Sequence, residues 1–237
     1  MAAAWLPQWA ELDDEERASL GDLVDWLVRT KHWEAARGFA LTQEVVVAIA
    51  AHAALLVLEL GRRPYRDVRA IVVHRGTIVR RGPRATGIPG VVADGPQRVL
   101  GHAHDRRGPV VISWDAARRD LRHPGRGQNV VLHEMAHKID AADGLFDGTP
   151  EIDDGPRRAE WVRVCTAEYR RLHRLSEPDP VLRPYAGESP SEFFAVATEA
   201  FFTRPQDLAD HHPTLYAALR AHYGQDPARR RARAAGH

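Results

Sequence analysis

The chain has 237 residues, of which 44% are hydrophobic and 27% charged, and its net charge is +1. These values are typical of a globular protein with one large domain or two small ones. The near-zero charge excludes a global electrostatic field that would attract nucleic acid or a membrane surface. The single cysteine, Cys165, excludes an intramolecular disulfide and a cysteine-based zinc site.

Two helices are predicted within residues 1–62. Leucine and valine recur at helical spacing across residues 11–37, after an acidic first turn that complements the helix dipole. A second helix is expected from Thr42, a suitable N-cap, to about Leu60, because Gly61 is a typical helix-ending residue. We expect this N-terminal helical part to pack on the rest of the chain.

The second of these helices is also the most apolar stretch of the chain. Residues 45–60 are fewer than the roughly 20 that span a bilayer, and they include His52 and Glu59. The N-terminus lacks the basic and apolar segments of a secretory signal. We therefore interpret residues 45–60 as a core helix and expect a cytoplasmic protein without a membrane partner.

Short β-branched runs follow. Residues 68–79 contain two such runs around Gly76, which predict two strands or a hairpin. Residues 108–114 form the clearest predicted strand and lie shortly before the histidine motif described next. An edge strand there could pair with an extended peptide, although an ordinary sheet strand is an equally good interpretation.

The segment after Asn129 contains the motif His133-Glu134-x-x-His137. Residues four apart on an α-helix lie about 40° from each other around its axis, so both imidazoles project from one face. Two histidines at this spacing bind one Zn²⁺, and Glu134 is then placed beside the water that the metal activates, as a general base requires. Asn129 is predicted to cap this helix rather than to orient substrate.

Acidic residues follow the motif. Asp140 suits a hydrogen bond from the non-ligating nitrogen of a histidine, and a surface position near the turn is an equally good interpretation. The acidic residues of segment 146–156 lack the EF-hand spacing, so we predict no calcium site. An amphipathic helix is expected over residues 161–175, with Cys165 as a buried small residue.

A catalytic zinc site needs a third protein ligand. No further histidine follows at the metzincin spacing, so the ligand is expected to be a carboxylate on another helix. Glu192 and Glu199 are seven residues apart on the predicted helix 190–202 and therefore share one face. Ser189 and Glu192 also match a capping box, which would occupy Glu192 at its own helix terminus. Periodicity alone does not choose between the two glutamates.

The C-terminal part is predicted to contain a helix over residues 213–223, followed by a basic segment. We expect residues 1–226 to form a single domain and residues 227–237 to be a disordered, solvated tail. The predicted fold class is α+β, mostly helical, with a small mixed or antiparallel sheet beside the helix that carries the two histidines.

Two segments closely resemble the Mlc titration factor A family of zinc peptidases. The first is Asn129-Val-Val-Leu-His133-Glu134-Met-Ala-His137-Lys-Ile-Asp140. The second is Tyr185-Ala-x-x-x-Pro-x-Glu192-x-Phe-Ala-Val-x-x-Glu199-x-Phe-Phe202. The similarity extends to the helix start at Leu41-Thr42, the strand 108–114 and the ending Gln225-Asp226-Pro227. It is specific because both motifs occur at the family's separation.

The resemblance implies a gluzincin with a zincin-like fold, related in its catalytic core to the protease domain of anthrax lethal factor. It implies one Zn²⁺ per chain, with Glu134 as general base and Tyr185 as a hydroxyl that stabilises the oxyanion. The zinc ligands implied by the resemblance are His133, His137 and Glu192.

Two other acids are expected to contact the ligand residues rather than the metal. Glu199 matches a further acid of the family pattern, and Asp140 suits a hydrogen bond with a histidine. The resemblance implies aminopeptidase-like hydrolysis of peptides. One alternative is a regulatory protein that sequesters a transcriptional repressor such as Mlc, which a family member binds. Another is a chance pair of histidines on a core helix. The intact Glu134 opposes a purely regulatory role, and the second motif opposes chance.

Overall fold

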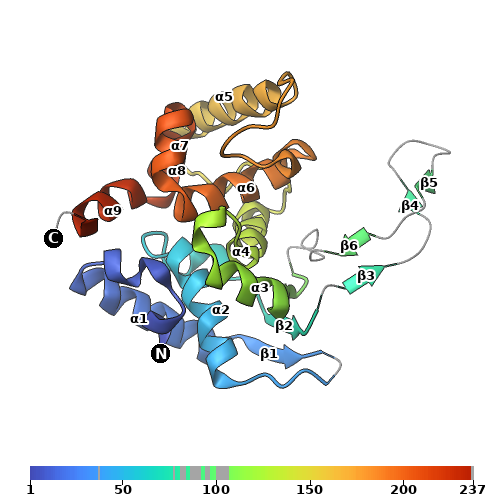
Figure 1. Ribbon diagram of the computed structural model, residues 1–237, viewed down its shortest axis with the longest axis vertical. Coiled ribbons are helices and arrows are strands. Elements are labelled where there is room, and N and C mark those ends of the chain that lie inside the picture. The colour runs from blue at the N-terminus through green and yellow to red at the C-terminus, as the bar shows by residue number, and fades with distance from the viewer. Residues whose placement is uncertain are drawn as a thin grey trace.

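The computed structural model describes residues 1–36, 38–76, 78–80, 84–85, 92–93, 97–99 and 107–235. Most of this described part is helical, which confirms the predicted α+β fold class with helix predominating (Figure 1). The α-helices are α1 (Asp14–Thr30), α2 (Gln43–Leu56), α3 (Trp114–Arg122), α4 (Val130–Asp140), α5 (Gly155–Leu172), α6 (Pro190–Thr203), α7 (Pro205–His211), α8 (Pro213–Tyr223) and α9 (Pro227–Ala235). The strands are β1 (His32–Ala35), β2 (Ala70–His74), β3 (Ile78–Arg80), β4 (Arg84–Ala85), β5 (Val92–Ala93), β6 (Gln97–Val99) and β7 (Val110–Ser113).

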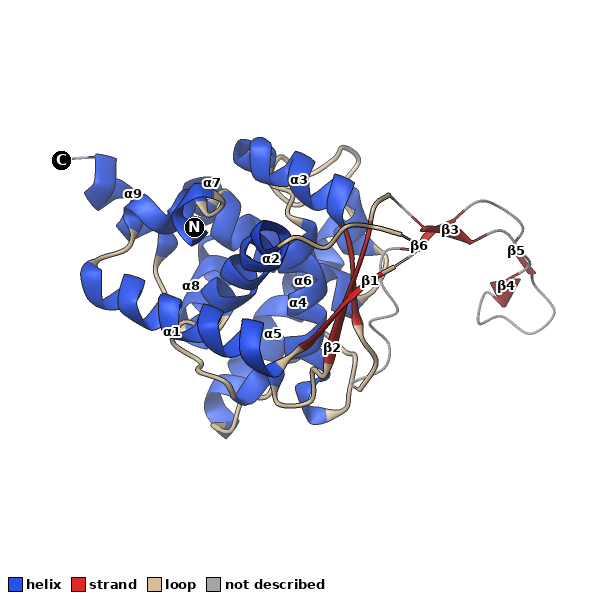
Figure 2. Ribbon diagram, turned by 90° about the horizontal axis from the view of Figure 1, so that it is seen from below, coloured by secondary structure: helices blue, strands red, loops and turns tan. Residues whose placement is uncertain are grey.

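The main sheet has the order β1-β2-β7 and lies at one side of the helices (Figure 2). Both strand pairs are parallel, with Trp33 opposite Ile71 and Ile71 opposite Val110. The prediction of a mixed or antiparallel sheet is therefore wrong for this sheet. Parallel strands need a long crossover connection, and α2 supplies one between β1 and β2. Antiparallel pairing occurs in the separate pairs β3–β6 and β4–β5.

The first strand falls where helix was predicted. α1 ends at Thr30, Lys31 is extended, and His32–Ala35 pairs with β2. The helical prediction continued to residue 37 because Trp33 lies seven residues after Trp26 and matched the apolar spacing of α1. Residue spacing does not reveal the partner strand, which comes some 40 residues later in the chain.

The helix α4 lies in the centre of the core and is buried at every residue. It packs against α6, α2 and β7. Its residues Val131, Leu132 and Met135 are fully buried. On α6, the buried rings of Phe194 and Phe201 pack against Trp161 of α5 and Tyr223 of α8. The polar residues His133, Glu134 and His137 are buried with it, and the burial of polar groups requires compensating partners.

The basic C-terminal segment is a helix rather than a disordered tail over residues 227–235. α9 packs beside the N-terminal segment, as Figure 1 shows. The Arg230 guanidinium is buried, with Nε 2.8 Å from Glu16 Oε1, and Arg231 pairs with Glu11. The prediction failed because the acids that neutralise these arginines come from the opposite end of the chain. Within the described residues, no helix is long and apolar enough to cross a bilayer.

Candidate metal centre

The histidine-bearing helix α4 begins with a side-chain cap. Asn129 Oδ1 accepts hydrogen bonds of 3.1 Å from the backbone N–H groups of Val131 and Leu132, which confirms the predicted cap. The backbone N–H of Asn129 in turn donates to Glu199 Oε2 at 2.6 Å. The start of α4 is therefore tied to α6, the helix that carries the candidate third ligand.

The helix α6 begins as the sequence predicted. Ser189 Oγ accepts a hydrogen bond of 3.1 Å from the backbone N–H of Glu192, and Pro190 occupies the first helical position. The Glu192 carboxylate does not complete a capping box, because its Oε2 lies 3.0 Å from His133 Nε2 and 3.4 Å from His137 Nε2. The structure thus removes the capping-box alternative for Glu192, and its role as a metal ligand stays a prediction.

Three atoms converge on one point: the Nε2 atoms of His133 and His137, which lie 3.2 Å apart, and Glu192 Oε2. A tetrahedral metal with bonds of 2.0–2.1 Å separates neighbouring donor atoms by about 3.3–3.4 Å. The three separations, 3.0, 3.2 and 3.4 Å, fit one face of such a tetrahedron. Glu192 Oε2 is buried and makes no well-formed hydrogen bond within the described residues. The donor set therefore fits a divalent cation.

The outer nitrogen of His133 faces Glu199. Nδ1 lies 2.7 Å from Glu199 Oε1, and the Arg183 guanidinium pairs with the same oxygen. Glu199 is 1% exposed. Its Oε1 contacts His133, and its Oε2 accepts the hydrogen bond from the backbone of Asn129, so both carboxylate oxygens have a partner. A carboxylate opposite Nδ1 places the ring proton there, so Nε2 of a neutral imidazole is left with a lone pair for a metal. The predicted position of Glu199 outside the three ligand residues matches this geometry.

The outer nitrogen of His137 faces a hydroxyl. Nδ1 lies 3.0 Å from Ser191 Oγ, which donates a hydrogen bond of 2.6 Å to Asp140 Oδ2. The contact between Asp140 and His137 therefore runs through Ser191, not through the direct histidine hydrogen bond that the sequence suggested. Asp140 is also fully buried, so the alternative of a surface acid is wrong.

The charges of the centre favour a cation. Burial alone would lower the pKa of His133, but the neighbouring Glu192 and Glu199 raise it to about 10. Conversely, burial alone would raise the pKa of Glu192, but His133 and His137 hold it well below its ordinary value. The carboxylates thus stabilise positive charge at the point where the three donor atoms meet, which is what a metal would supply.

Glu134 is 2% exposed and does not belong to the group of converging donor atoms. One residue along an α-helix rotates a side chain by about 100°, which turns Glu134 away from the line of the histidines. Burial raises the pKa of Glu134 to about 7, with Glu192 and Glu199 adding to the effect and His133 opposing it. A carboxyl group with such a pKa can both accept and release a proton near neutral pH.

Tyr185 approaches the centre from the short 3₁₀ helix Pro184–Gly187. Its hydroxyl donates a hydrogen bond of 3.0 Å to Glu192 Oε1, and its ring lies 5.9 Å from that of His133. The Arg183 guanidinium lies over the Tyr185 ring at 5.6 Å. The structure brings Tyr185 and Glu199 to the converging candidate ligands His133, His137 and Glu192. It adds two residues that match no motif: Arg183, two positions before Tyr185, and Ser191, directly before Glu192.

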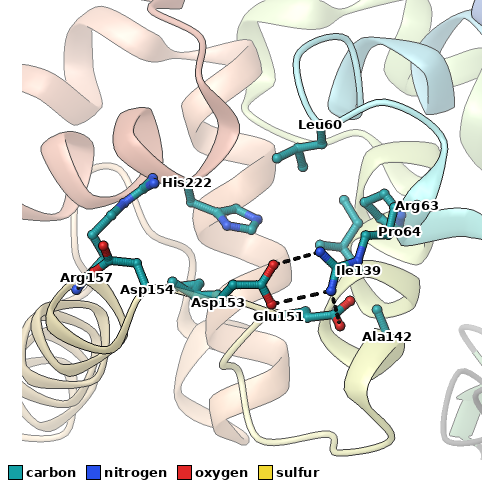
Figure 3. Close-up of a pocket in the computed structure, with 11 residues that line it drawn as sticks. Leu60, Arg63, Pro64, Ile139, Ala142, Glu151, Asp153, Asp154, Arg157 and His222 are labelled. Carbon is teal, nitrogen blue, oxygen red and sulfur yellow. Dashed lines mark hydrogen bonds and ion pairs between the residues drawn. The ribbon is translucent and has the colours of Figure 1, made fainter.

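A well-formed pocket of about 290 Å³ lies elsewhere, at the C-terminal end of α4 (Figure 3). Ile139 and Ala142 form part of its wall, and the Arg63 guanidinium at its rim bridges Asp153 and Glu151. None of the converging donor residues lines it. The candidate chemistry therefore belongs to the α4–α6 interface and not to this pocket.

Comparison with known proteins finds relatives that match nearly the whole chain. The family model of the glucose-regulated metallo-peptidase M90 matches residues 1–224. An uncharacterized protein of Synechocystis sp., slr2042, is 34% identical over 94% of this chain and 81% of its own length. Mlc titration factor A of Edwardsiella ictaluri is 31% identical over 96% of this chain and 87% of its own. That of Pectobacterium atrosepticum is 30% identical over 95% and 85%. The chain therefore belongs to the glucose-regulated metallo-peptidase M90 family and is related to the Mlc titration factor A proteins.

Proposed function

We propose that the protein is a zinc-dependent peptidase of the gluzincin type with aminopeptidase-like activity. The observation that supports this most strongly is the convergence of His133 Nε2, His137 Nε2 and Glu192 Oε2 within 3.0–3.4 Å of one another. Two nitrogens and one carboxylate oxygen are a common donor set of catalytic zinc. Membership of the family supports a metallopeptidase. That the metal is zinc and that cleavage begins at peptide N-termini are parts of this proposal.

The protein's own residues have distinct roles in this mechanism. When bound, zinc would polarise the scissile carbonyl and lower the pKa of a water molecule. Glu134 takes a proton from the attacking water and passes it to the leaving amine, the role of a general base and then of a general acid. The Tyr185 hydroxyl donates a hydrogen bond to the carbonyl oxygen as negative charge develops. Glu199 holds the His133 ring in the orientation that ligation requires.

The substrate is expected to bind in an extended conformation. β7 is the terminal strand of the described order β1-β2-β7, and it packs against α4. An extended peptide that adds to such a strand presents successive carbonyl groups at regular spacing. We propose that β7 holds substrate in this way, beside the helix that carries Glu134.

A digest of a peptide library by the zinc-loaded protein tests the proposal, with cleavage positions read by mass spectrometry. We expect single residues to be released from free N-termini, and an N-acetylated copy of the library to resist cleavage. Internal cleavage of both libraries would replace the aminopeptidase assignment by an endopeptidase. Absence of cleavage, or equal cleavage by Glu134→Gln, would contradict the proposed mechanism.

A second role is raised by the name of the relatives. Mlc titration factor A proteins are named for the repressor Mlc, and a binding role for a transcriptional regulator, in the cytoplasm where regulators act, is a separate proposal for this chain. A pull-down with Glu134→Gln as bait separates the two roles. Binding of a repressor by this variant would support the regulatory role independently of hydrolysis, and its absence would oppose it.

A further inference from the structure

Ser191 lies at a junction between the two helices of the candidate metal centre. It occupies the second position of α6, directly before Glu192. Its Oγ is 3.0 Å from Nδ1 of His137 on α4 and 2.6 Å from Oδ2 of Asp140, one turn further along the same helix. A single hydroxyl therefore contacts a candidate metal ligand and a fully buried acid.

The direction of the two hydrogen bonds follows from the protons available. A hydroxyl has one proton and donates it to the Asp140 carboxylate, which accepts at 2.6 Å. Its oxygen lone pair is then left to accept a hydrogen bond from His137 Nδ1–H, so the ring proton of the neutral imidazole is on Nδ1. The opposite nitrogen, Nε2, keeps its lone pair and faces His133 Nε2 and Glu192 Oε2.

We propose that Ser191 is a positioning residue for His137: it fixes the ring orientation and tautomer in which Nε2 is available to the metal, and Asp140 acts through it. The inference rests on the metal site of the proposed function. It extends that site, because α6 would then hold both imidazoles, His133 through Glu199 and His137 through Ser191. The first turn of α6 supplies both the ligand Glu192 and the group that orients the neighbouring ligand.

A purely structural role would also explain the contacts, because Ser191 and Asp140 form a hydrogen bond between packed helices. The two roles differ in what they predict for metal binding. A packing hydrogen bond contributes to stability alone, whereas removal of an outer partner of a metal-bound histidine typically lowers metal affinity 10- to 100-fold.

The test compares Ser191→Ala with a matched variant, Thr198→Val. Thr198 is a buried residue of the same helix whose hydroxyl bonds to Tyr223 at 2.8 Å, away from the histidines. Zinc affinity is measured by competition with a chromogenic chelator, and thermal unfolding of the metal-free proteins reports stability. We expect both variants to unfold at lower temperature, and only Ser191→Ala to bind zinc about 10- to 100-fold more weakly.

Restoring the hydroxyl gives a second, independent measurement. Ser191→Thr keeps the hydroxyl. Ser191→Val introduces a side chain of nearly the same shape as threonine but without a hydroxyl. We expect the threonine variant to bind zinc nearly as tightly as the unsubstituted protein and the valine variant to bind it as weakly as Ser191→Ala. The absorption bands of the cobalt-substituted proteins should shift in the alanine and valine variants only. This pair keeps the inference testable if Ser191→Ala fails to fold.

The outcomes separate this inference from the proposed function. If the unsubstituted protein binds zinc tightly and Ser191→Ala or Ser191→Val binds it equally tightly, the positioning role is overturned and the metal site stands. If the unsubstituted protein itself binds no zinc, the proposed function fails first.

Discussion

At the scale of single residues, each nitrogen of His133 has a different partner on α6. Glu192 Oε2 lies beside Nε2, and Glu199 Oε1 lies beside Nδ1. The two glutamates are seven residues, or about two turns, apart and share a helix face, so the His133 ring contacts two points of α6 that are about two turns apart. Helical spacing alone does not choose between Glu192 and Glu199 as the metal ligand. In the structure both lie on the face of α6 that contacts His133.

Tyr185 is expected to act on the reaction and not on metal retention. Its hydroxyl bonds to Glu192 Oε1, the oxygen that is not among the converging donor atoms. Tyr185→Phe should lower kcat about 100-fold, the typical effect of losing one donor to an oxyanion, and should retain stoichiometric zinc. Kinetics at saturating zinc together with metal analysis check this. A variant with full kcat at saturating zinc but weakened zinc binding would show that the hydroxyl serves only to orient Glu192.

The residues of the centre differ in how far the sequence could predict them. His133, Glu134 and His137 lie within one helical turn, so their spacing alone predicts a shared site. Ser191 could not be predicted, because a serine in the first turn of a helix usually interacts with its own helix terminus. Its actual partners, His137 and Asp140, lie some 50 residues earlier, and only the packing of α4 on α6 brings them together.

At the scale of elements, the start of α6 depends on the loop before α5. Gly148 has a φ of +76°, and a Cβ atom there would lie 2.4 Å from the backbone oxygen of Pro190. The Trp161 indole also donates to the carbonyl of Gly148 at 3.0 Å, which fixes the loop from the other side. The turn that carries Ser191 and Glu192 is therefore held in place by a close backbone contact that only glycine permits.

Gly148→Ala is expected to destabilise the protein and to weaken metal binding together. A left-handed backbone conformation alone costs a non-glycine residue about 1–3 kcal/mol, and relief of the contact requires Pro190 to move. Gly155→Ala is a matched control, because nothing lies within 4 Å of a Cβ atom there and its φ is not positive. Urea unfolding and zinc competition would show a loss for Gly148→Ala only. Equal behaviour of the two variants would contradict this account of the loop.

Helix termini could be predicted well and strand pairing poorly. The caps Thr42, Asn129 and Ser189 were all predicted, because a cap is a local interaction between a side chain and the next turn. The parallel sheet could not be predicted, since β1 is the short, mostly exposed segment His32–Ala35 and its pairing with β2 depends on the crossover through α2. The helix α3 was missed as well.

At the scale of the whole molecule, His52 and His222 are buried outside the metal centre, and burial favours their neutral forms. Burial lowers the pKa of His52 to about 4, with a hydrogen bond to Ala48 opposing it. Burial, with Arg157 adding to it, lowers the pKa of His222 to about 3. Both groups take up a proton more readily in the unfolded chain, near pH 6.5. Their contribution to stability is therefore present above pH 6.5 and is lost as the pH falls towards 4 and 3.

About half of the acid sensitivity expected from these two histidines can be assigned to His222. At pH 5 each histidine should lower the free energy of unfolding by about 2 kcal/mol relative to pH 7. His222→Phe, whose ring would remain among Trp161, Phe194 and Tyr223, should remove about half of that combined loss. Urea unfolding of the metal-free proteins at both pH values measures it, with the exposed His211→Gln as control. An unchanged pH dependence in His222→Phe would contradict the assignment.

The two chain ends also illustrate a limit of local prediction. Glu16 completes the capping box of α1 with Asp13 and at the same time neutralises the buried Arg230 of α9. The capping box is readable from adjacent residues, but the ion pair joins residues more than 200 positions apart. A basic run thus resembled a disordered tail, although its charges are matched across the molecule.

The central claim is that His133, His137 and Glu192 hold one zinc ion and that Glu134 moves the proton. The measurement that tests it most directly is zinc content together with peptide hydrolysis in the protein and in Glu134→Gln. We predict one zinc per chain in both and loss of nearly all hydrolysis in the variant, because the amide cannot accept the proton. Absence of zinc in the unsubstituted protein, or full hydrolysis by Glu134→Gln, would contradict the account.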